Sequence, residues 1–375
     1  MNSNRITNIE VKKNNRNRIF RYILKCKTVS NPEIAYDLKI SLPTVTQNTK
    51  ELIDQGLIRE TGELKSTGGR RAKALSAAAD FKLAVGLDIT QNHIALLLTN
   101  LTGEILKYKR MHQTYLGSDD YYQEVCRKLE AFLKESSAER DSILGIGISF
   151  PGIVDLQNQK ISYSHALGIK DLPFREIEQF FPYPVSFLND ANAGAYTEGI
   201  LAEKEDRFFY LSLSNTVGGA IFYRGQLIQG NEFRCGEAGH MTIVPDGRPC
   251  YCGKSGCLDA YCSAKRLSDL AEEKLQDYFE GLKQGKETYV AAWEEYTDYL
   301  AIALNNLHMV LDCDIILGGY AGSYLEDYIP KIREKVSRRN TFSKESGFVK
   351  PCRYKVGAAA HGAALQVIEE FIEQV

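Results

Sequence analysis

The chain has 375 residues, of which 44% are hydrophobic, so it is long enough for two or three packed domains. No run of about 18 apolar residues occurs, and the basic N-terminal segment lacks an apolar signal core, so we expect a cytoplasmic protein that makes no contact with a membrane. Nine cysteines, four of them between Cys250 and Cys262, fit a metal site in a reducing compartment better than a disulfide framework.

Charge is distributed unevenly along the chain. Residues 1–75 carry 15 Lys and Arg against 7 Asp and Glu, whereas the remaining 300 residues carry 31 against 41. A basic head on an acidic body predicts that the head binds a polyanion such as DNA. The alternative is a solvated basic tail, but the head also has the pattern of a folded domain.

Apolar residues at helical spacing predict three helices in the head, the first over 14–27. Ser30 followed by Glu33 predicts a capping box at the start of the second helix. Ser41 caps the third helix, which Gly56 ends. The second and third helices are joined by only two residues, which is typical of a helix-turn-helix motif.

The third helix is the predicted recognition helix. Its outward side chains fit a major groove, where Thr and Gln bond base edges and Lys neutralises a phosphate. The predicted DNA contacts are Thr44, Thr46, Gln47 and Lys50.

The next segment predicts a winged hairpin followed by a flexible arginine arm. Its strand at 57–60 leads through a polar stretch to Gly68, Gly69, Arg70 and Arg71. A small cationic arm of this kind can enter a narrow, A·T-rich minor groove; the alternative is an ordinary basic loop. We therefore predict a winged helix-turn-helix domain over 1–75 and a linker over 76–81.

From residue 82 to 375 the pattern changes to an α/β body of two lobes, with antiparallel strands first and βα units later. Strands are predicted at 82–88, 93–99, 104–111, 143–150, 184–188, 208–213, 218–223 and 315–319. Helices are predicted at 120–134, 190–202 and 291–311, and a strand followed by a helix at 354–372.

A metal site is predicted over 240–257. His240, Cys250, Cys252 and Cys257 offer one imidazole and three thiolates, a closed tetrahedral set for Zn²⁺. Because protein atoms fill all four positions, this zinc would be structural. The alternative is free thiols on a loop, and Cys262 is interpreted as a buried thiol.

A second group of polar residues is typical of hydroxyl binding. Asn189 and Asp190 stand at a strand-to-helix junction, and Glu237 and His240 follow later in the chain. Carboxylates accept hydrogen bonds from sugar hydroxyls, and an amide both donates and accepts. From spacing alone, the Asn-Asp pair could equally be a helix cap.

These segments resemble the ROK (repressor, open reading frame, kinase) family over almost the whole chain. The matching stretches are Ser41 to Thr46, Gly69 to Arg71, Pro151 to Asp155, Asn189 to Ala193, Gly236 to His240 and Cys250 to Asp259. The resemblance implies an actin-like, ribonuclease-H-like sugar kinase fold of two α/β lobes. It also implies that Asn189, Asp190, Glu237 and His240 bind a sugar, and that His240 contacts both zinc and sugar.

The sequence departs from the family at two of the glycine-rich turns that hold ATP in its kinases. The first turn, Asp88 to Asn92, lacks both glycines, and the second, Ser214 to Ala220, lacks three, while the third, Gly318-Gly319, is kept. Side chains therefore occupy space that phosphate oxygens need. The family usually has Glu at the sugar-binding position Asp259, and many members have Asn near Ala166.

The expected function is a sugar-responsive DNA-binding repressor of carbohydrate metabolism genes, without kinase activity. Members of the family with this organisation respond to a sugar or sugar phosphate and form dimers or tetramers. The alternative is an active sugar kinase with a regulatory head, in which Asp190 would be the catalytic base. A third option is a DNA-binding sensor that activates transcription, or one whose sugar acts as co-repressor, because the sequence does not set the sign of regulation.

Overall fold

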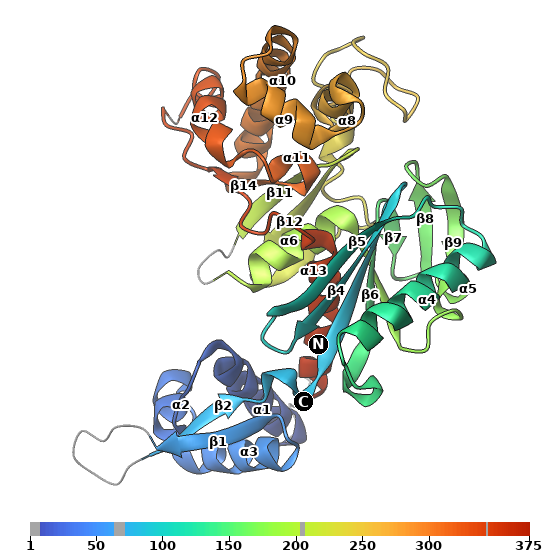
Figure 1. Ribbon diagram of the computed structural model, residues 1–375. Helices are drawn as coiled ribbons and strands as arrows, with labels where there is room; N and C mark the ends of the chain where they lie inside the picture. The colour runs from blue at the N-terminus through green and yellow to red at the C-terminus, as the bar shows by residue number, and fades with distance from the viewer. Residues whose placement is uncertain (1–7, 64–71, 203–206, 343) are drawn as a thin grey trace, which may run out of the picture.

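The computed structural model describes residues 8–63, 72–202, 207–342 and 344–375, which form a small head and a larger body of two lobes (Figure 1). Buried Ile19, Phe20, Ile34, Val45 and Leu52 form the core of the head. The elements of the head are α1 (Asn8–Lys25), α2 (Asn31–Leu38), α3 (Leu42–Asp54), β1 (Ile58–Glu63) and β2 (Lys73–Ala77).

Side-chain caps fix the helix-turn-helix, as the sequence predicts. The hydroxyl of Ser30 accepts a hydrogen bond from the Glu33 amide (3.4 Å), and the Glu33 carboxylate accepts one from the Ser30 amide (2.7 Å). The hydroxyl of Ser41 caps α3 by accepting a hydrogen bond from the Thr44 amide (3.4 Å). Lys39 turns the chain between α2 and α3 with a left-handed backbone (φ 54°). The predicted capping box is confirmed.

Strands β1 and β2 pair antiparallel and form the wing. The predicted arm residues Arg70 and Arg71 lie outside the described residues; in the sequence they fall between the two strands of the hairpin, not after it. Ser76 pairs with Arg59 and Ala77 with Ile58. The link between head and body is therefore shorter than the predicted 76–81, because the wing strand continues through Ala77.

The first lobe is built on a five-stranded sheet in the order β10-β6-β3-β4-β5. The strands are β3 (Leu83–Ile89), β4 (His93–Asn100), β5 (Ile105–His112), β6 (Ile143–Phe150) and β10 (Val185–Asn189). Helix α4 (Asp119–Glu135) buries Val125, Leu129 and Phe132 against one face of this sheet. All five strands were predicted, because their apolar runs are long and bounded by turn residues.

A small three-stranded sheet extends this lobe, and the sequence analysis missed it. It consists of β7 (Ile153–Asp155), β8 (Lys160–Ser164) and β9 (Ile169–Pro173), followed by the short helix α5 (Arg175–Glu178). Its strands are too short and too polar to give a clear periodicity. Val154, Ile161, Ser164 and Ile169 are buried in it, while its other residues are at least partly exposed.

The second lobe contains the five-stranded sheet β13-β12-β11-β14-β15 and several helices. Its strands are β11 (Arg207–Leu213), β12 (Val217–Tyr223), β13 (Gln226–Ile228), β14 (Asp314–Gly318) and β15 (Val349–Pro351). Its helices are α7 (Asp259–Cys262), α8 (Lys265–Ser268), α9 (Leu275–Lys283), α10 (Glu287–Leu311), α11 (Gly319–Gly322) and α12 (Ile329–Ser337). Helix α10 supplies much of the core of this lobe, with Trp293, Leu300 and Leu304 buried.

Two helices, α6 (Asp190–Ile200) and α13 (Ala358–Gln374), lie between the sheets of the two lobes (Figure 1). Their backbones approach their neighbours closely because glycines remove the side chains. A Cβ at Gly86 of β3 would lie 1.7 Å from the carbonyl oxygen of Ala360, and one at Gly362 of α13 would lie 1.8 Å from that of Ala193 in α6. Helix α13 is thus fixed to both the first sheet and α6.

The predicted strand starting at Tyr354 is wrong. The strand before the last helix is β15, and residues 352–357 lead into α13 without strand pairing. The buried carboxylate of Glu198 accepts hydrogen bonds from the amides of Arg353 (2.8 Å) and Tyr354 (3.0 Å), so these amides bind a side chain in place of a neighbouring strand. Within the described ranges, every helix is too short or too polar to cross a lipid bilayer.

Candidate functional site

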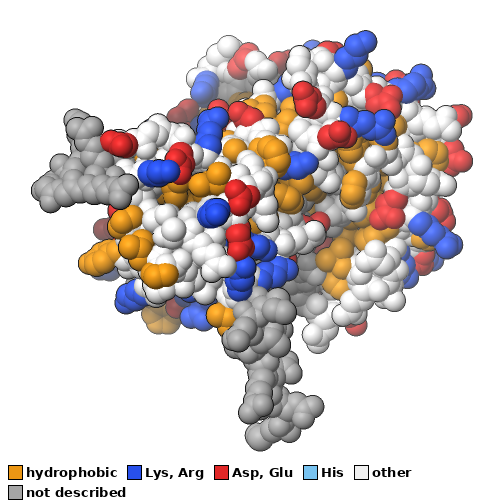
Figure 2. All heavy atoms as spheres, turned by 90° about the horizontal axis from the view of Figure 1, so that it is seen from below, with side chains coloured by type: hydrophobic (Ala, Val, Ile, Leu, Met, Phe, Trp, Pro, Cys, Tyr) orange, Lys and Arg blue, Asp and Glu red, His pale blue; other side chains and the backbone are white. Residues whose placement is uncertain are grey.

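The outer face of α3 carries most of the predicted DNA contacts. Thr46, Gln47 and Lys50 are exposed at helical spacing, whereas Thr44 is half-buried and its hydroxyl is hydrogen-bonded to that of Ser41 (2.7 Å). The apolar spacing predicts Leu42 on the inner side of this helix, but this is wrong: at its first position Leu42 is 47% exposed. Figure 2 shows this end of the molecule, where basic and hydrophobic side chains are interspersed.

The head is docked on the C-terminal end of α13. Arg21 of α1 forms an ion pair with Glu369. The side chains of Asn17 and Arg16 donate hydrogen bonds to the backbone carbonyls of Ile372 and Val375. These carbonyls lie at the C-terminal end of the helix, where few intrahelical donors remain; the Ile372 carbonyl also accepts from the Val375 amide (3.2 Å). The head therefore contacts the body through a specific polar surface.

The four predicted metal ligands lie together. The candidate ligand atoms of His240, Cys250, Cys252 and Cys257 all lie within 4.8 Å of one another. Nδ1 of His240 is the nitrogen that faces this cluster, 4.0 Å from Sγ of Cys250. One imidazole nitrogen and three sulfurs fit the tetrahedral preference of Zn²⁺. Cys262 lies outside the cluster, fully buried, with its sulfur 3.6 Å from the carbonyl oxygen of Tyr296.

Asn189 is the N-cap of α6. Its Oδ1 accepts hydrogen bonds from the amides of Ala191 (2.9 Å) and Asn192 (3.0 Å), and its Nδ2 donates to the carbonyl of Gly152 (2.8 Å). The helix-cap interpretation is therefore confirmed for Asn189. One amide hydrogen of this side chain remains for a ligand.

Asp190, the first residue of α6, belongs to an acidic cluster at the junction of the lobes. Burial, together with the negative charges of Asp88 and Glu237, raises the pKa of Asp190 to about 7. Burial also raises the pKa of Asp88 to about 6, although the Ser149 hydroxyl donates a hydrogen bond to it (2.8 Å). Asp190 and Glu237 are thus brought together although 47 positions separate them in the chain.

Asp259 is buried and is already bonded within the protein. Its Oδ2 accepts a hydrogen bond from the Val217 amide (2.5 Å), and the Tyr251 hydroxyl is a second hydrogen-bonding partner of its carboxyl. Burial raises the pKa of this carboxyl to about 6. Asp259, which is predicted to contact the sugar in place of the family's longer Glu, therefore also holds the turn before β12 in place.

An aromatic group, which the sequence analysis missed, connects these residues across the lobes. The Tyr251 ring centroid lies 5.5 Å from that of His240 and 5.0 Å from that of His165. Burial and the negative charges of Asp259 and Glu237 raise the pKa of Tyr251. His165 comes from the loop between β8 and β9, in the small sheet that the periodicity did not predict.

The backbone amides of the retained glycine turn are bonded to side chains of the protein. The Gly319 amide donates to the hydroxyl of Tyr210 (3.0 Å), and the Tyr320 amide donates to that of Ser214 (3.1 Å). The guanidinium of Arg110, from β5 in the other lobe, lies 5.5 Å from the ring centroid of Tyr320. Phosphate at such a turn is bound by backbone amides that point at it, so here it would compete with the two hydroxyls for these amides.

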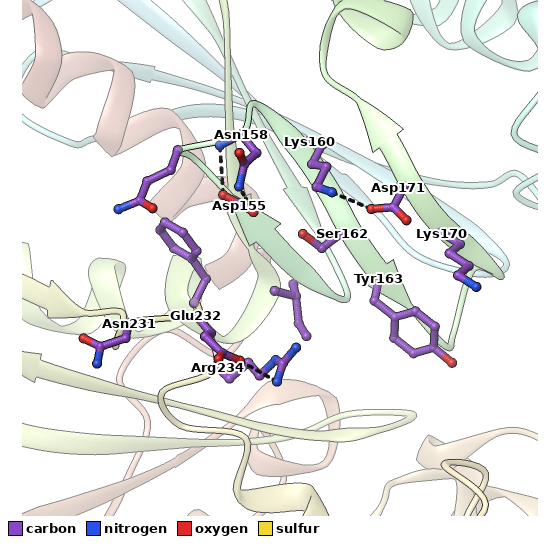
Figure 3. Close-up of a pocket in the computed structure, with 13 residues that line it drawn as sticks. Asp155, Asn158, Lys160, Ser162, Tyr163, Lys170, Asp171, Asn231, Glu232 and Arg234 are labelled. Carbon is purple, nitrogen blue, oxygen red and sulfur yellow. Dashed lines mark hydrogen bonds and ion pairs between the residues drawn. The ribbon is translucent and has the colours of Figure 1, made fainter.

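A polar pocket of about 740 Å³ lies between the small sheet and segment 231–234 (Figure 3). Its charged side chains are largely paired with one another: Lys160 with Asp171 and Arg234 with Glu232, each at 2.6 Å. Tyr163 also lines it. Because the Tyr163 hydroxyl is hydrogen-bonded to Nδ1 of His165 (2.9 Å), this residue connects the pocket with the aromatic group.

Known proteins share both parts of this architecture. The ROK family model matches residues 84–370, and the model of a winged helix-turn-helix DNA-binding domain matches residues 13–59. A putative xylose repressor of Caldicellulosiruptor sp. (strain Rt8B.4) is 29% identical in an alignment of 354 positions that covers 88% of each chain.

Two solved structures confirm the fold. A ROK family transcriptional regulator, a homologue of the E. coli MLC protein, matches with a TM-score of 0.78 and 23% identity, over 97% of both chains. The ROK hexokinase of Thermus thermophilus matches with a TM-score of 0.62 and 27% identity, over 77% of this chain and 99% of the hexokinase. The molecule is a winged helix-turn-helix head joined to an actin-like, ribonuclease-H-like body. Since the ROK model spans well over half of its residues, the chain belongs to the ROK family.

Proposed function

We propose that the protein is a sugar-responsive, DNA-binding repressor of carbohydrate metabolism genes. The observation that carries this proposal is the docking of the DNA-binding head on α13, the helix that also packs against α6. Because α6 begins at Asp190, one rigid connection runs from the acidic cluster to the head. The similarity to a putative xylose repressor over 88% of each chain supports a sugar as the effector.

The sugar is proposed to bind at Asn189, Asp190, Glu237, His240 and Asp259. Carboxylates and the second Asn189 amide hydrogen suit hydroxyl groups, and so does the His240 ring nitrogen on the side away from Cys250. Zn²⁺ at His240, Cys250, Cys252 and Cys257 would have a structural role, fixing the His240 ring and the surrounding loop. In the same proposal, sugar binding changes the angle between the lobes and so moves α13 relative to the head.

DNA binding is proposed to use Thr46, Gln47 and Lys50 in the major groove, with Thr44 supporting the start of the helix. Arg70 and Arg71 would reach the adjacent minor groove. A two-fold operator calls for two heads, so we propose a homodimer or a tetramer. Such a protein acts in the bacterial cytoplasm, where the chromosome lies.

Loss of kinase activity is part of the proposal. It is supported by the hydrogen bonds that the hydroxyls of Tyr210 and Ser214 accept from the Gly319 and Tyr320 amides. In addition, side chains replace glycines in the first two turns, at Thr90 and Thr216 among others. A nucleotide phosphate would have to displace these internal contacts before it could bind.

Gel-shift titration of DNA from upstream of the protein's own gene, with and without a panel of pentoses, hexoses and their phosphates, tests this proposal. We expect specific binding that one class of sugar changes at least 5-fold, the usual scale of an allosteric coupling. The sign of the change decides between an inducer and a co-repressor. Binding that ignores every carbohydrate in the panel would contradict the proposal.

An active sugar kinase is the second candidate, and one observation favours it. The pKa of Asp190, raised to about 7, suits a general base that takes a proton from a sugar hydroxyl near neutral pH. Measurement of ATP consumption over the same sugar panel decides between the candidates. Turnover that Asp190→Asn abolishes would establish the kinase and refute the loss of phosphotransfer.

A further inference from the structure

His165 faces the zinc-ligand loop from the opposite lobe. Its ring centroid lies 5.0 Å from that of Tyr251 and 6.3 Å from that of His240. His165 belongs to the loop after β8, in the first lobe, whereas Tyr251 and His240 belong to the second. His165 therefore stands on the opposite wall of the junction that contains Glu237 and His240.

Tyr163 fixes the orientation of the His165 imidazole. The Tyr163 hydroxyl is hydrogen-bonded to Nδ1 of His165 at 2.9 Å, and the two rings meet edge to face with centroids 4.3 Å apart. Among the described residues, none is hydrogen-bonded to Nε2, and the side chain is exposed. In the neutral ring one nitrogen donates and the other accepts, so the role of Nε2 depends on the role that Nδ1 takes toward Tyr163.

We infer that His165, positioned by Tyr163, is a specificity-determining residue of the sugar site that hydrogen-bonds one sugar hydroxyl through Nε2. The inference rests on the proposed sugar response and adds a contact from the first lobe. A hydroxyl group matches either state of Nε2, because it both donates and accepts. The neighbouring Tyr251 ring, 46% exposed, offers a flat apolar surface beside that contact.

A purely structural role for His165 predicts a different result from a sugar-reading role. If the ring only holds the lobes together, its removal should raise the dissociation constants of all sugars by the same factor. A ring that hydrogen-bonds one hydroxyl favours sugars that present this hydroxyl, so its removal changes the ratio of their dissociation constants. The ratio between sugars is therefore the decisive measurement.

The experiment measures dissociation constants of the full chain for D-xylose, D-glucose, D-galactose and D-mannose by calorimetry. These sugars differ from glucose at one ring position each, at C5, C4 or C2. Wild type is compared with His165→Ala, His165→Gln and Tyr163→Phe. For His165→Ala we expect about 10-fold weaker binding of the preferred sugar and a much smaller change for the poorest, the size of one hydrogen bond.

The conservative variants and a matched control complete the test. His165→Gln keeps a hydrogen-bonding group and should recover part of the preference. Tyr163→Phe should weaken binding of the preferred sugar about 3-fold, because the His165 ring loses the hydrogen bond that orients it. His112→Ala removes an exposed histidine of β5, whose ring contacts His93, and should leave all four constants unchanged. Operator binding without sugar, equal to wild type, shows that each variant is folded.

Each outcome gives a distinct answer. Wild-type binding with unchanged ratios in His165→Ala overturns the inference and leaves the sugar response intact. A uniform loss for all four sugars assigns His165 a structural role and also overturns it. If wild type binds none of the four sugars, the constants are measured for the carbohydrates that change operator binding. If operator binding ignores the whole panel of sugars and sugar phosphates, the proposed function fails together with the inference.

Discussion

Arg21 of α1 and Glu369 of α13 form an ion pair with an N–O distance of 2.5 Å, which joins the DNA-binding head to the last helix of the body. Both side chains are only partly exposed, at 34% and 24%. The negative end of the helix dipole favours cations at the C-terminal turn of α13, where Arg16 also binds. This surface lies between the proposed sugar site and the proposed DNA contacts.

Arg21→Ala is expected to weaken the coupling between sugar and DNA more than it weakens the binding of DNA. The partly exposed pair should contribute about 1 kcal/mol to head docking, so the sugar-induced change in operator affinity should fall several-fold. Gel-shift titrations with and without sugar measure this change. In a double-mutant cycle, adding Glu369→Ala to Arg21→Ala should change the sugar-induced shift in operator affinity little further. Fully additive effects of the two substitutions on this shift would show that the pair does not act as a unit.

The stability of the protein should depend on pH through Asp190. Its pKa is about 7 in the folded state and about 3.9 in an unfolded chain, so between these values the folded state holds a proton that the unfolded state lacks. The free energy of unfolding therefore falls as pH rises through 7. Asp190→Asn removes this loss, so its stability relative to wild type should rise by roughly 2 kcal/mol between pH 5.5 and pH 8.

Urea unfolding at the two pH values measures this difference. Asp171→Asn is the matched control, because Asp171 is exposed and its ion pair with Lys160 lowers the pKa of its carboxyl. That carboxyl stays ionised over the whole interval and should contribute no difference. An equal pH dependence in wild type and Asp190→Asn would show that Asp190 titrates near its ordinary pKa.

Removal of one metal ligand should lower both the zinc content and the thermal stability of the protein. Cys252→Ser is expected to lose bound zinc and to lower the melting temperature by roughly 5–10 °C, because metal binding contributes directly to folding. Cys262→Ser, a change at a thiol outside the cluster, should keep one zinc per chain. Elemental analysis and thermal unfolding measure the two effects; a zinc-free wild type would contradict the metal assignment.

Lys50 and Gln47 should affect DNA binding in different ways. Lys50→Ala is expected to weaken binding to all DNA sequences by a similar factor, because one phosphate contact is lost. The slope of log affinity against log salt concentration should fall in magnitude by about 1. Gln47→Ala should relax the preference at one base pair, by about 1–3 kcal/mol. Lys274→Ala, at an exposed lysine of the body, is the control. A change in base preference in Lys50→Ala would reverse the roles.

Gly86→Ala is expected to disrupt the junction between β3 and α13. The added methyl group would lie 1.7 Å from the carbonyl oxygen of Ala360, and both backbones are held by buried neighbours. The cost should exceed 3 kcal/mol or abolish soluble expression. Gly347→Ala meets no atom within 4 Å and should behave as wild type in thermal unfolding. A stable Gly86→Ala protein would show that α13 can shift away from the sheet.

The sequence predicted the elements whose signals are local. The capping box of Ser30 and Glu33, the apolar run of β6 and the Cys-rich spacing of 250–257 each lie within a few residues, where periodicity and side-chain chemistry decide the structure. The predicted strand at Tyr354 failed because Glu198, 156 positions earlier, binds its amide. No local pattern contains that partner.

For this protein the sequence alone determined the kind of chemistry: a basic helix-turn-helix head, a Cys₃His metal set and carboxylates near a strand-to-helix junction. Only the tertiary structure decided which residues meet across the lobes, such as His165 with Tyr251, and that the head rests on α13. The physical reason is that residue type and spacing fix what a side chain can bind. Which distant groups it reaches depends on how sheets and helices far apart in the chain pack together.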